Sequence, residues 1–382
     1  MNLQALLLCT DEKIVRVLRR VLNDLEITVE HCVDAELAIL KLSRRRFEAV
    51  IVDCEDPETA GQILKAARNA PANKKAVAVA ILDGNRAMRS AFQLGAHFVL
   101  YKPISPERAR GSFRAARALM KCERRRAARA PVEMPVMYRF IQQGEHGGIE
   151  RTVSVDLSED GIGVRLARRH RERGPLHVQF KLPGTNRLIE AEAELAWENP
   201  NGQAGLRFLE LPQPTREALK TWLKASSSEE DDPPSPCTLT DLSLGGCYLE
   251  TATPFPIRAR LALHMKVGTL QVHASGIVRV MHADTGMGVV FIQKTAEQRR
   301  EVENFIQALM NSNGAVPELA VEADGLEIFG DEATLPAPSD MEDPLLQLFD
   351  TKADVPTEEF LVELRKQRGS GTGEASESIL PQ

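Results

Sequence analysis

Three arginines in the middle of this chain, Arg124, Arg125 and Arg129, are the residues best suited to binding chemistry. The planar guanidinium group of arginine donates paired hydrogen bonds that match phosphate oxygens and the O6 and N7 atoms of guanine. It can also stack on the face of a purine. Arg125 and Arg129, four positions apart, would share one face of a helix or flank a bend in an extended chain. A ligand with phosphates and purines would suit them, and a solvated basic helix end is the plain alternative.

A second polar group follows one strand later, in the sequence D-L-S-E-D-G from Asp156 to Gly161. Asp156 can accept from guanine N–H groups or orient an arginine, and Ser158 offers a small hydroxyl and open backbone donors. Gly161 would permit a left-handed turn and a close approach of the backbone to a ligand. An ordinary Asp–Gly turn is the alternative for this group alone. The order of the two groups, inside a strand-rich segment, favours a ligand site.

The R-x-x-x-R spacing of Arg125 and Arg129, followed by this D-x-S-x-x-G sequence, resembles the PilZ domain. That family binds the bacterial second messenger cyclic di-GMP, which offers two phosphates and two guanine edges. The resemblance implies that cyclic di-GMP is bound by Arg124, Arg125, Arg129, Asp156, Ser158 and Gly161. In this family an arginine directly ahead of the pair often accompanies a stacked ligand dimer.

Residues 123–225, assigned to this domain, also have the pattern of a small antiparallel β-barrel. Hydrophobic residues alternate with a period of two at 132–140, 151–156, 161–166, 176–182, 188–197 and 205–210. A helical segment at 215–224 closes the domain. We expect Trp197 and Phe208 in its core. The basic segment Arg168–Arg173 is expected to be a solvated loop, with an extra phosphate contact as the alternative.

Residues 1–122 alternate between strand and helix patterns. Strands are predicted at 5–9, 27–32, 49–53, 76–82 and 98–101, and helices at 13–25, 36–42, 59–67 and 86–94. Such alternation predicts an α/β fold with a doubly wound, five-stranded parallel sheet. Functional residues of these folds lie at the carboxyl ends of strands, where Asp53 and Lys102 are found.

This layout resembles the receiver domain of response regulators, in which Asp53 would be the phospho-accepting aspartate. Further residues of this chain match the family's pattern after Asp53, namely Pro57, Gly61, Gly95-Ala96 and Lys102-Pro103. The chain departs from the family's pattern at the positions that would bind magnesium and the phosphoryl group. The acidic pair that holds magnesium falls at Thr10 and Asp11, and the Ser/Thr at the end of the fourth strand falls at Asp83.

The switch aromatic of the fifth strand is also replaced, by Val99. Phosphoryl transfer to a carboxylate needs a metal to neutralise the moving oxygens, so the loss of one acid matters. We therefore expect a receiver-shaped interaction or dimerisation module. The alternative is a phospho-acceptor site of Asp53, Asp11 and Lys102, in which Asp11 and Asp53 would hold Mg²⁺ weakly. No other metal or cofactor is expected.

A helix pattern at 106–126 leads from the receiver-like domain directly into the arginines. Beyond an acidic, proline-containing linker at 226–236, the barrel pattern repeats at 237–312. Asp241-Leu-Ser-Leu-Gly-Gly246 echoes the first D-x-S-x-x-G sequence, and a helix at 297–310 echoes the closing helix. The residues ahead of this copy are Glu, Asp, Pro and Ser, which would repel a diphosphate. We expect a degenerate, structural or protein-binding PilZ-like domain.

Residues 313–382 are acidic and contain Pro, Ser and Gly, which predicts a disordered tail. Two amphipathic pieces lie within it, Pro344–Phe349 and Glu358–Leu364. They are docking peptides for a protein partner or transient helices, and the sequence leaves both open.

Composition sets the remaining limits on function. The net charge of −6 carries no global nucleic-acid signature, and no apolar run is long enough to span a membrane. The six cysteines show no C-x-x-C pair, so free thiols in the bacterial cytoplasm are expected. No nucleophile motif or phosphate loop indicates an enzyme. We expect a cytoplasmic cyclic di-GMP effector that changes protein–protein interactions, with a homodimer left open.

Two alternatives from other classes remain. One is a phosphorylation-driven response regulator with PilZ output. The other is a nucleic-acid-binding regulator that uses the basic surface between Arg108 and Arg187.

Overall fold

The structure is a computed structural model of the chain. It describes residues 3–84, 91–92, 94–127, 129–141, 148–166, 174–199, 201–226, 232–282, 285–293, 295–312, 316–327, 343–352 and 355–369. The chain forms two compact units, one of residues 1–123 with 232–382 and the other of residues 124–231. In sequence, the second unit is therefore an insertion within the first.

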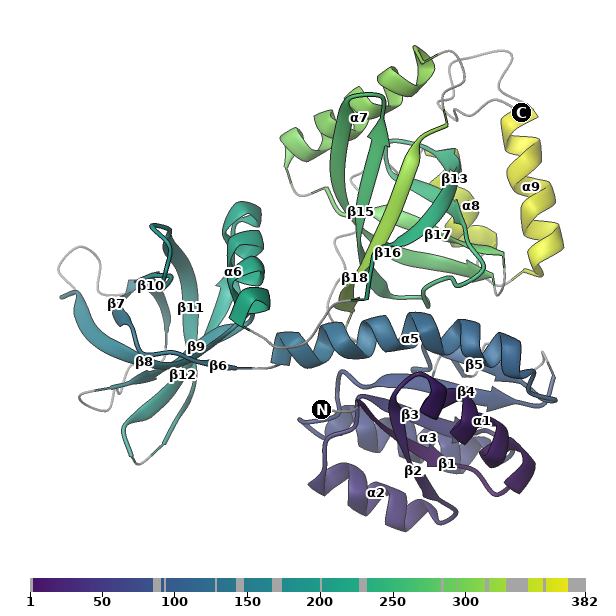
Figure 1. Ribbon diagram of the computed structural model, residues 1–382, viewed down its shortest axis with the longest axis horizontal. Coiled ribbons are helices and arrows are strands. Elements are labelled where there is room, and N and C mark those ends of the chain that lie inside the picture. The colour runs from purple at the N-terminus through teal and green to yellow at the C-terminus, as the bar shows by residue number, and fades with distance from the viewer. Residues whose placement is uncertain are drawn as a thin grey trace. The chain divides into compact units, whose positions relative to one another are not determined.

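The first unit begins with a five-stranded parallel sheet in the order β2-β1-β3-β4-β5 (Figure 1). The strands are β1 (Leu3–Leu8), β2 (Ile27–Cys32), β3 (Ala49–Asp53), β4 (Val77–Leu82) and β5 (Phe98–Tyr101). The helices between them are α1 (Glu12–Asp24), α2 (Ala35–Arg44) and α3 (Pro57–Asn69). All six residues of β4 are buried, as expected of a strand covered on both faces. The predicted α/β fold is confirmed, while the helix predicted at 86–94 lies largely outside the described residues.

Aspartates define where the first helices begin. Asp11, Asp34 and Asp56 each precede a helix in extended conformation and accept a hydrogen bond from a backbone N–H of its first turn. A carboxylate at this position satisfies an otherwise unpaired donor and complements the positive end of the helix. These short polar signals, with the apolar strands, fix the alternation of elements.

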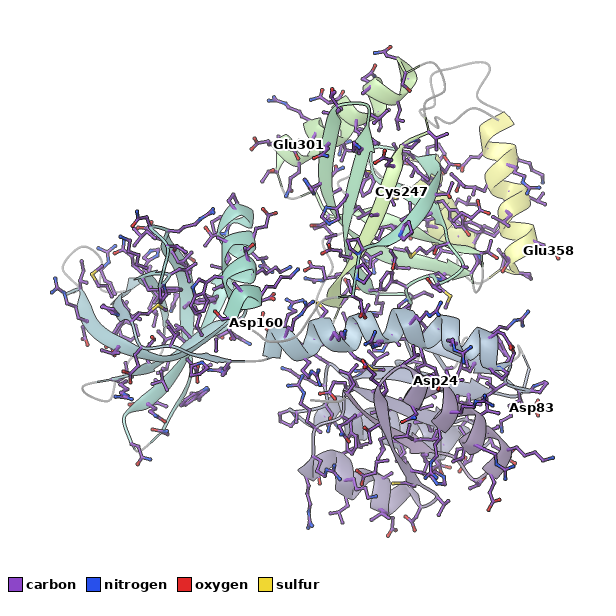
Figure 2. The ribbon with its side chains drawn as sticks, viewed as in Figure 1. Asp24, Asp83, Asp160, Cys247, Glu301 and Glu358 are labelled. Carbon is purple, nitrogen blue, oxygen red and sulfur yellow. The ribbon has the colours of Figure 1, made fainter. Side chains whose placement is uncertain are left out.

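The long helix α5 (Pro106–Ala127) holds the first unit together. The side of α5 that carries Ala109, Phe113, Ala116 and Met120 is buried. Polar contacts join α5 to the end of α1, where Arg110 lies 3.0 Å from Asp24, a residue labelled in Figure 2. The helix predicted at 106–126 is confirmed, and one of its sides shares the hydrophobic core of the parallel sheet.

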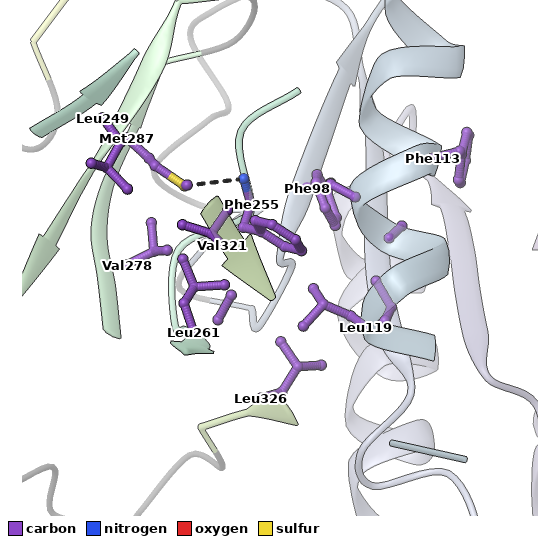
Figure 3. Close-up of a cluster of buried hydrophobic side chains, with 14 of the residues drawn as sticks. Phe98, Phe113, Leu119, Leu249, Phe255, Leu261, Val278, Met287, Val321 and Leu326 are labelled. Atoms are coloured by element: carbon purple, nitrogen blue, oxygen red, sulfur yellow. Dashed lines mark hydrogen bonds between the residues drawn. The ribbon is translucent and has the colours of Figure 1, made fainter. Parts of the chain in front are cut away.

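The opposite side of α5 is buried as well, in a core shared with a β-barrel from the C-terminal half (Figure 3). Leu119 of the helix and Phe98 of the sheet belong to the same hydrophobic cluster as Phe255 and Leu326 of the barrel. The carboxylate of Glu123, only 4% exposed, accepts a 2.7 Å hydrogen bond from the Leu326 N–H. The receiver-like domain and the second barrel therefore share one core, although they are far apart in sequence.

This barrel closes in the order β13-β14-β17-β16-β15-β18. Its strands are β13 (Ser235–Leu242), β14 (Gly246–Glu250), β15 (Ala259–Val267), β16 (Leu270–His282), β17 (Gly286–Phe291) and β18 (Glu318–Leu326), and α7 (Ala296–Met310) packs beside it. The boundary predicted at residue 312 is too early, because β18 pairs with both β13 and β15 and closes the ring. In the first half of β18, the buried residues Leu319 and Val321 alternate with exposed or half-buried ones, but the acidic residues around them obscure this pattern in the sequence.

Part of the segment expected to be a disordered tail is also folded. Helices α8 (Pro344–Lys352) and α9 (Thr357–Gly369) cover the two amphipathic pieces. Their apolar side chains form a cluster with Tyr248 and Val280 of the second barrel. Residues 328–342 and 370–382 lie outside the described part of the chain.

The second unit is the first PilZ-like barrel of the sequence. Its elements are β6 (Ala130–Pro131), β7 (Pro135–Phe140), β8 (Glu150–Ser158), β9 (Gly161–Arg165), β10 (Pro175–Lys181), β11 (Leu188–Glu198), β12 (Gln203–Glu210) and α6 (Gln213–Ser226). The strand order is β6-β8-β7-β10-β11-β12-β9, and pairing of β8 with β9 closes six of these strands into a barrel. Phe208 is buried as predicted. The loop Arg168–Arg173 lies outside the described residues.

Candidate functional site

The three arginines lie at the end of α5 and just beyond it. Arg124 and Arg125 belong to the last turn of the helix, whereas Arg129 follows it and precedes β6. Arg125 and Arg129 therefore flank the end of a helix instead of sharing one of its faces. Arg126 adds a fourth guanidinium group, 3.6 Å from Asp160 and 3.8 Å from Glu159 in the turn between β8 and β9.

One contact connects the two motifs directly. The Arg129 guanidinium donates a 2.7 Å hydrogen bond to the Asp156 carboxylate. Backbone pairing supports this contact, because Pro131 of β6 pairs with Asp156 of β8. The side chains of Arg129 and Asp156 remain 41% and 27% exposed, so both can still be reached from solvent. Of the two roles predicted for Asp156, orienting an arginine is the one that this contact serves.

Ser158 and Gly161 shape the turn between β8 and β9. The buried Ser158 hydroxyl donates to the Gly161 carbonyl oxygen at 3.0 Å. Gly161 begins β9 and is not among the glycines with a positive φ, so the left-handed turn expected there is not formed. Its lack of a side chain serves packing instead, because a Cβ atom would lie 2.3 Å from the Leu206 carbonyl oxygen.

Strand pairing places four residues in one row across the outer surface of the barrel. Asp156 pairs with Gly163, Gly163 with Gly205, and Gly205 with Trp197. The side chains at the two ends lean over the glycines. A Cβ atom on Gly163 would lie 2.6 Å from the Asp156 carboxylate, and one on Gly205 would lie 2.2 Å from the Trp197 Nε1 atom. We call this Asp156–Gly163–Gly205–Trp197 row the glycine row.

Trp197 is not a core residue, contrary to the sequence prediction, since it is 44% exposed. The strict alternation of β11 would point it inward with Ile189, Ala191 and Leu195. A register shift between Leu195 and Trp197 adds one unpaired residue and turns the indole outward. The sequence carries only a weak signal for this bulge. The glycine row is therefore not predicted from the sequence.

An open depression of about 380 Å³ lies on the same barrel, lined by Gly174, Pro175, Glu194, Leu195, Ala196 and Arg207. Arg207 pairs in register with Gly161 and forms an ion pair with Glu194. Its side chain is 63% exposed. The backbone of Arg207 therefore lies beside the turn of the D-x-S-x-x-G sequence, while its guanidinium group is directed to Glu194 on β11.

In the receiver-like domain, Asp53 and Lys102 meet as expected of carboxyl-end residues. The Lys102 ammonium lies 2.9 Å from the Asp53 carboxylate, and the Cys9 thiol donates to the same oxygen at 3.3 Å. Burial disfavours the charge on Lys102, but the hydrogen bond and charge of Asp53 outweigh it and raise the pKa of Lys102. Burial and the neighbouring Asp53 raise the pKa of the Cys9 thiol to about 11, so that thiol is neutral.

The donors around Asp53 do not form a good magnesium site. Asp11 caps α1, where one of its oxygens accepts from the N–H groups of Lys13 and Ile14. One oxygen of Asp53 is engaged by Lys102 and Cys9, and Mg²⁺ demands near-ideal octahedral oxygen geometry. Asp83, labelled in Figure 2, is exposed just after β4 and would repel a phosphate on Asp53. Among the described residues, no group of His, Cys, Asp and Glu side chains is arranged to hold a metal ion.

Comparison with known proteins agrees with the barrels. Residues 123–225 and residues 226–308 each match the family model of the PilZ domain. No curated protein matches the chain. None of the helices in the described residues is long and apolar enough to cross a membrane.

Solved structures resemble single parts of the chain at low sequence identity. The chemotaxis response regulator CheY4 of Vibrio cholerae is 22% identical over 30% of this chain and 99% of its own, with a TM-score of 0.29. A receiver domain of a sensor histidine kinase from Pseudomonas aeruginosa, with bound magnesium, is 18% identical over 32% and 99%, with a TM-score of 0.28. A PilZ domain from a cellulose-synthesizing bacterium is 17% identical over 26% and 96%, with a TM-score of 0.21.

The order of the parallel sheet, the two closed barrels and the two family matches lead to one identification. The chain carries a receiver-like domain and two PilZ domains.

Proposed function

We propose that the protein is a cyclic di-GMP effector that binds its ligand at the first PilZ domain. The observation that carries the proposal is the 2.7 Å contact between Arg129 and Asp156, which joins the two motifs beside the glycine row. A phosphate or guanine edge arriving there meets the exposed Arg129 guanidinium, the Asp156 carboxylate as an acceptor for guanine N–H groups, and the exposed Trp197 indole over Gly205. Receiver-like and PilZ domains bind and regulate, so the proposed role involves no catalysis.

The ligand would act through the end of α5. The last turn of this helix carries Arg124 and Arg125, while its earlier turns build the core of the first unit. A dianion bound between Arg125, Arg129 and the turn at Asp156–Gly161 would compete with the Asp156 carboxylate for the Arg129 guanidinium and so rearrange the ion pairs at the helix end. Binding would then order the helix end and change the surface offered to a protein partner, provided that the ligand prefers one arrangement. Arg124 would add a second, stacked ligand molecule.

Calorimetric titration of the full chain with cyclic di-GMP tests this proposal. Arg125→Ala and Arg129→Ala should each weaken binding by about 1–3 kcal/mol, the usual size of a charge-assisted two-pronged contact. The control is Arg165→Ala on β9 of the same barrel, whose side chain is 60% exposed and pairs with Glu133. That variant should bind as the unchanged chain does.

Absence of heat and of ligand displacement at saturating cyclic di-GMP would overturn the proposal. DNA binding that weakens steeply with salt and ignores cyclic di-GMP would support the nucleic-acid alternative. The phosphorylation alternative retains one supporting observation, the Asp53–Lys102 contact, and is tested below.

A further inference from the structure

Helices α8 and α9 bury a surface of the second barrel that a closed barrel would otherwise expose. Val280 and Tyr248 of the barrel are 0% and 1% exposed beneath them. The covering side chains are Leu345, Leu346, Leu348, Phe349, Phe360 and Leu364, all at most 6% exposed. Such a continuous apolar contact stabilises the two helices by removing large side chains from water.

The covered surface corresponds to the glycine row of the first barrel. Asp241 pairs with Tyr248, Tyr248 with Gly288, and Gly288 with Val280, which repeats the pairing from Asp156 to Trp197. A register shift just before Val280 matches the one just before Trp197. The two barrels thus share this surface, but the second one presents Tyr and Val where the first has Gly and Trp.

The segment that covers this surface begins with an anchored carboxylate. One Asp343 oxygen accepts a 3.2 Å hydrogen bond from the Gly245 N–H, within the turn of the second D-x-S-x-x-G sequence. The other oxygen accepts from the Leu345 N–H at 3.0 Å and caps α8. A backbone donor of the motif therefore holds a carboxylate of the protein itself.

Two apolar side chains then fill the space left by glycines. A Cβ atom on Gly245 would lie 2.4 Å from the Leu346 side chain, and one on Gly288 would lie 2.6 Å from the Phe349 ring. Phe360 of α9 completes the contact. The centroid of its ring lies 5.5 Å from that of the Tyr248 ring and 4.5 Å from that of the His282 ring. The Tyr248 hydroxyl and the His282 Nδ1 atom are 3.1 Å apart and pair beneath the helices. Among the described residues, the His282 Nε2 atom is buried without a hydrogen-bond partner.

We propose that the second PilZ domain is a peptide-recognition domain and that residues 343–369 are its ligand within the same chain. The site selects an acidic residue followed by an amphipathic helix, in the pattern Asp-Pro-Leu-Leu-x-Leu-Phe. Main-chain capture of the carboxylate orients the peptide, and the groove over Gly245 and Gly288 accepts its large side chains. A partner protein that presents this pattern would compete for the groove.

A labelled peptide of residues 343–369, followed by fluorescence anisotropy, tests the proposal on the full chain. Leu346→Asp in the chain should release its own segment, because Leu346 is 4% exposed beneath α8. The control is Val362→Asp, since Val362 lies on α9 and is 48% exposed. The peptide should bind Leu346→Asp at least about tenfold more tightly than the unchanged chain or the control, because the tethered competitor is lost.

The groove itself is tested by changing the peptide. A peptide with Phe349→Asp should not bind the Leu346→Asp chain. If that chain keeps its cooperative unfolding and still fails to bind the unchanged peptide, the helices are ordinary packing and the proposal falls.

A milder substitution, Asp343→Asn, provides a test if the Leu346→Asp chain does not fold. Asp343→Asn in the chain should speed hydrogen exchange at the Gly245 amide and increase peptide binding. Unchanged exchange and unchanged binding would contradict a carboxylate-anchored site.

Discussion

At the scale of single residues, Trp197 is the side chain that the geometry adds to the candidate site. It covers Gly205 at the end of the row that begins with Asp156, and 44% of its surface is exposed. A broad, exposed indole is a suitable face for a purine, and stacking of a base on an aromatic side chain contributes about 1–3 kcal/mol. We expect Trp197→Ala to weaken cyclic di-GMP binding by about that amount.

Fluorescence can follow Trp197 separately, because the chain has two tryptophans. The other one, Trp222 on α6, donates to the Pro183 carbonyl oxygen. In a Trp222→Phe chain, cyclic di-GMP should quench the remaining emission while the affinity stays unchanged. Unaltered emission at saturating ligand would exclude a purine from the indole.

Asp53 is the second residue whose chemistry can be tested. Its carboxylate is engaged by Lys102 and Cys9, the magnesium donors are incomplete, and Asp83 adds a like charge. We expect no phosphate uptake from acetyl phosphate in the presence of Mg²⁺, as judged by intact-protein mass. A mass increase of one phosphate that Asp53→Asn abolishes would restore the response-regulator alternative.

At the scale of elements, regular strands and helices can be predicted from the period of the apolar residues. Features that depend on a single irregular residue, such as a β-bulge, cannot. The five strands of the receiver-like sheet and the helices predicted at 13–25, 36–42 and 59–67 follow from apolar patterns, and the structure confirms them. The outward turn of Trp197 depends on one bulged residue, which leaves no clear mark on the pattern. Strand β18 and helices α8 and α9 depend on a distant barrel surface, so local composition suggested disorder instead.

The contact between α9 and the barrel should depend on pH through His282. Burial lowers the pKa of His282 from 6.5 to about 4. Between these values the unfolded chain binds a proton that the folded chain does not, so stability rises with pH and is lost as the pH falls below about 6.5. We expect this residue to reduce the free energy of unfolding by about 1–2 kcal/mol between pH 7 and pH 5.

Denaturant titrations of the unchanged chain and of the His282→Gln chain, each at pH 7 and pH 5, measure how much His282 contributes to the pH dependence of the free energy of unfolding. The buried His97, whose pKa is also lowered, is present in both chains and cancels in the difference. An equal loss of stability in both chains would mean that His282 stays neutral in the unfolded protein or charged in the folded one.

At the scale of the whole molecule, the first PilZ domain is an insertion in a unit whose two sequence halves share a core. Leu119 of α5 is fully buried among residues of the sheet and of the second barrel. The connection returns through Asp232, which lies 2.9 Å from Arg117 and 2.8 Å from Lys121 of the same helix. The receiver-like domain and the second PilZ domain should therefore unfold together, and the first PilZ domain separately.

Thermal unfolding with and without ligand distinguishes the two units. Cyclic di-GMP at one hundred times its dissociation constant should stabilise the first PilZ domain by about 2.7 kcal/mol, because the proposed site lies in that folded unit alone. The other transition should not move with ligand. It should move with Leu119→Ala, by about 2–5 kcal/mol, the usual cost of a large buried cavity. A single transition that shifts with both the ligand and the mutation would contradict this prediction. It would show that the first PilZ domain and the rest of the chain unfold as one cooperative unit, because a ligand stabilises every part that unfolds in the same transition.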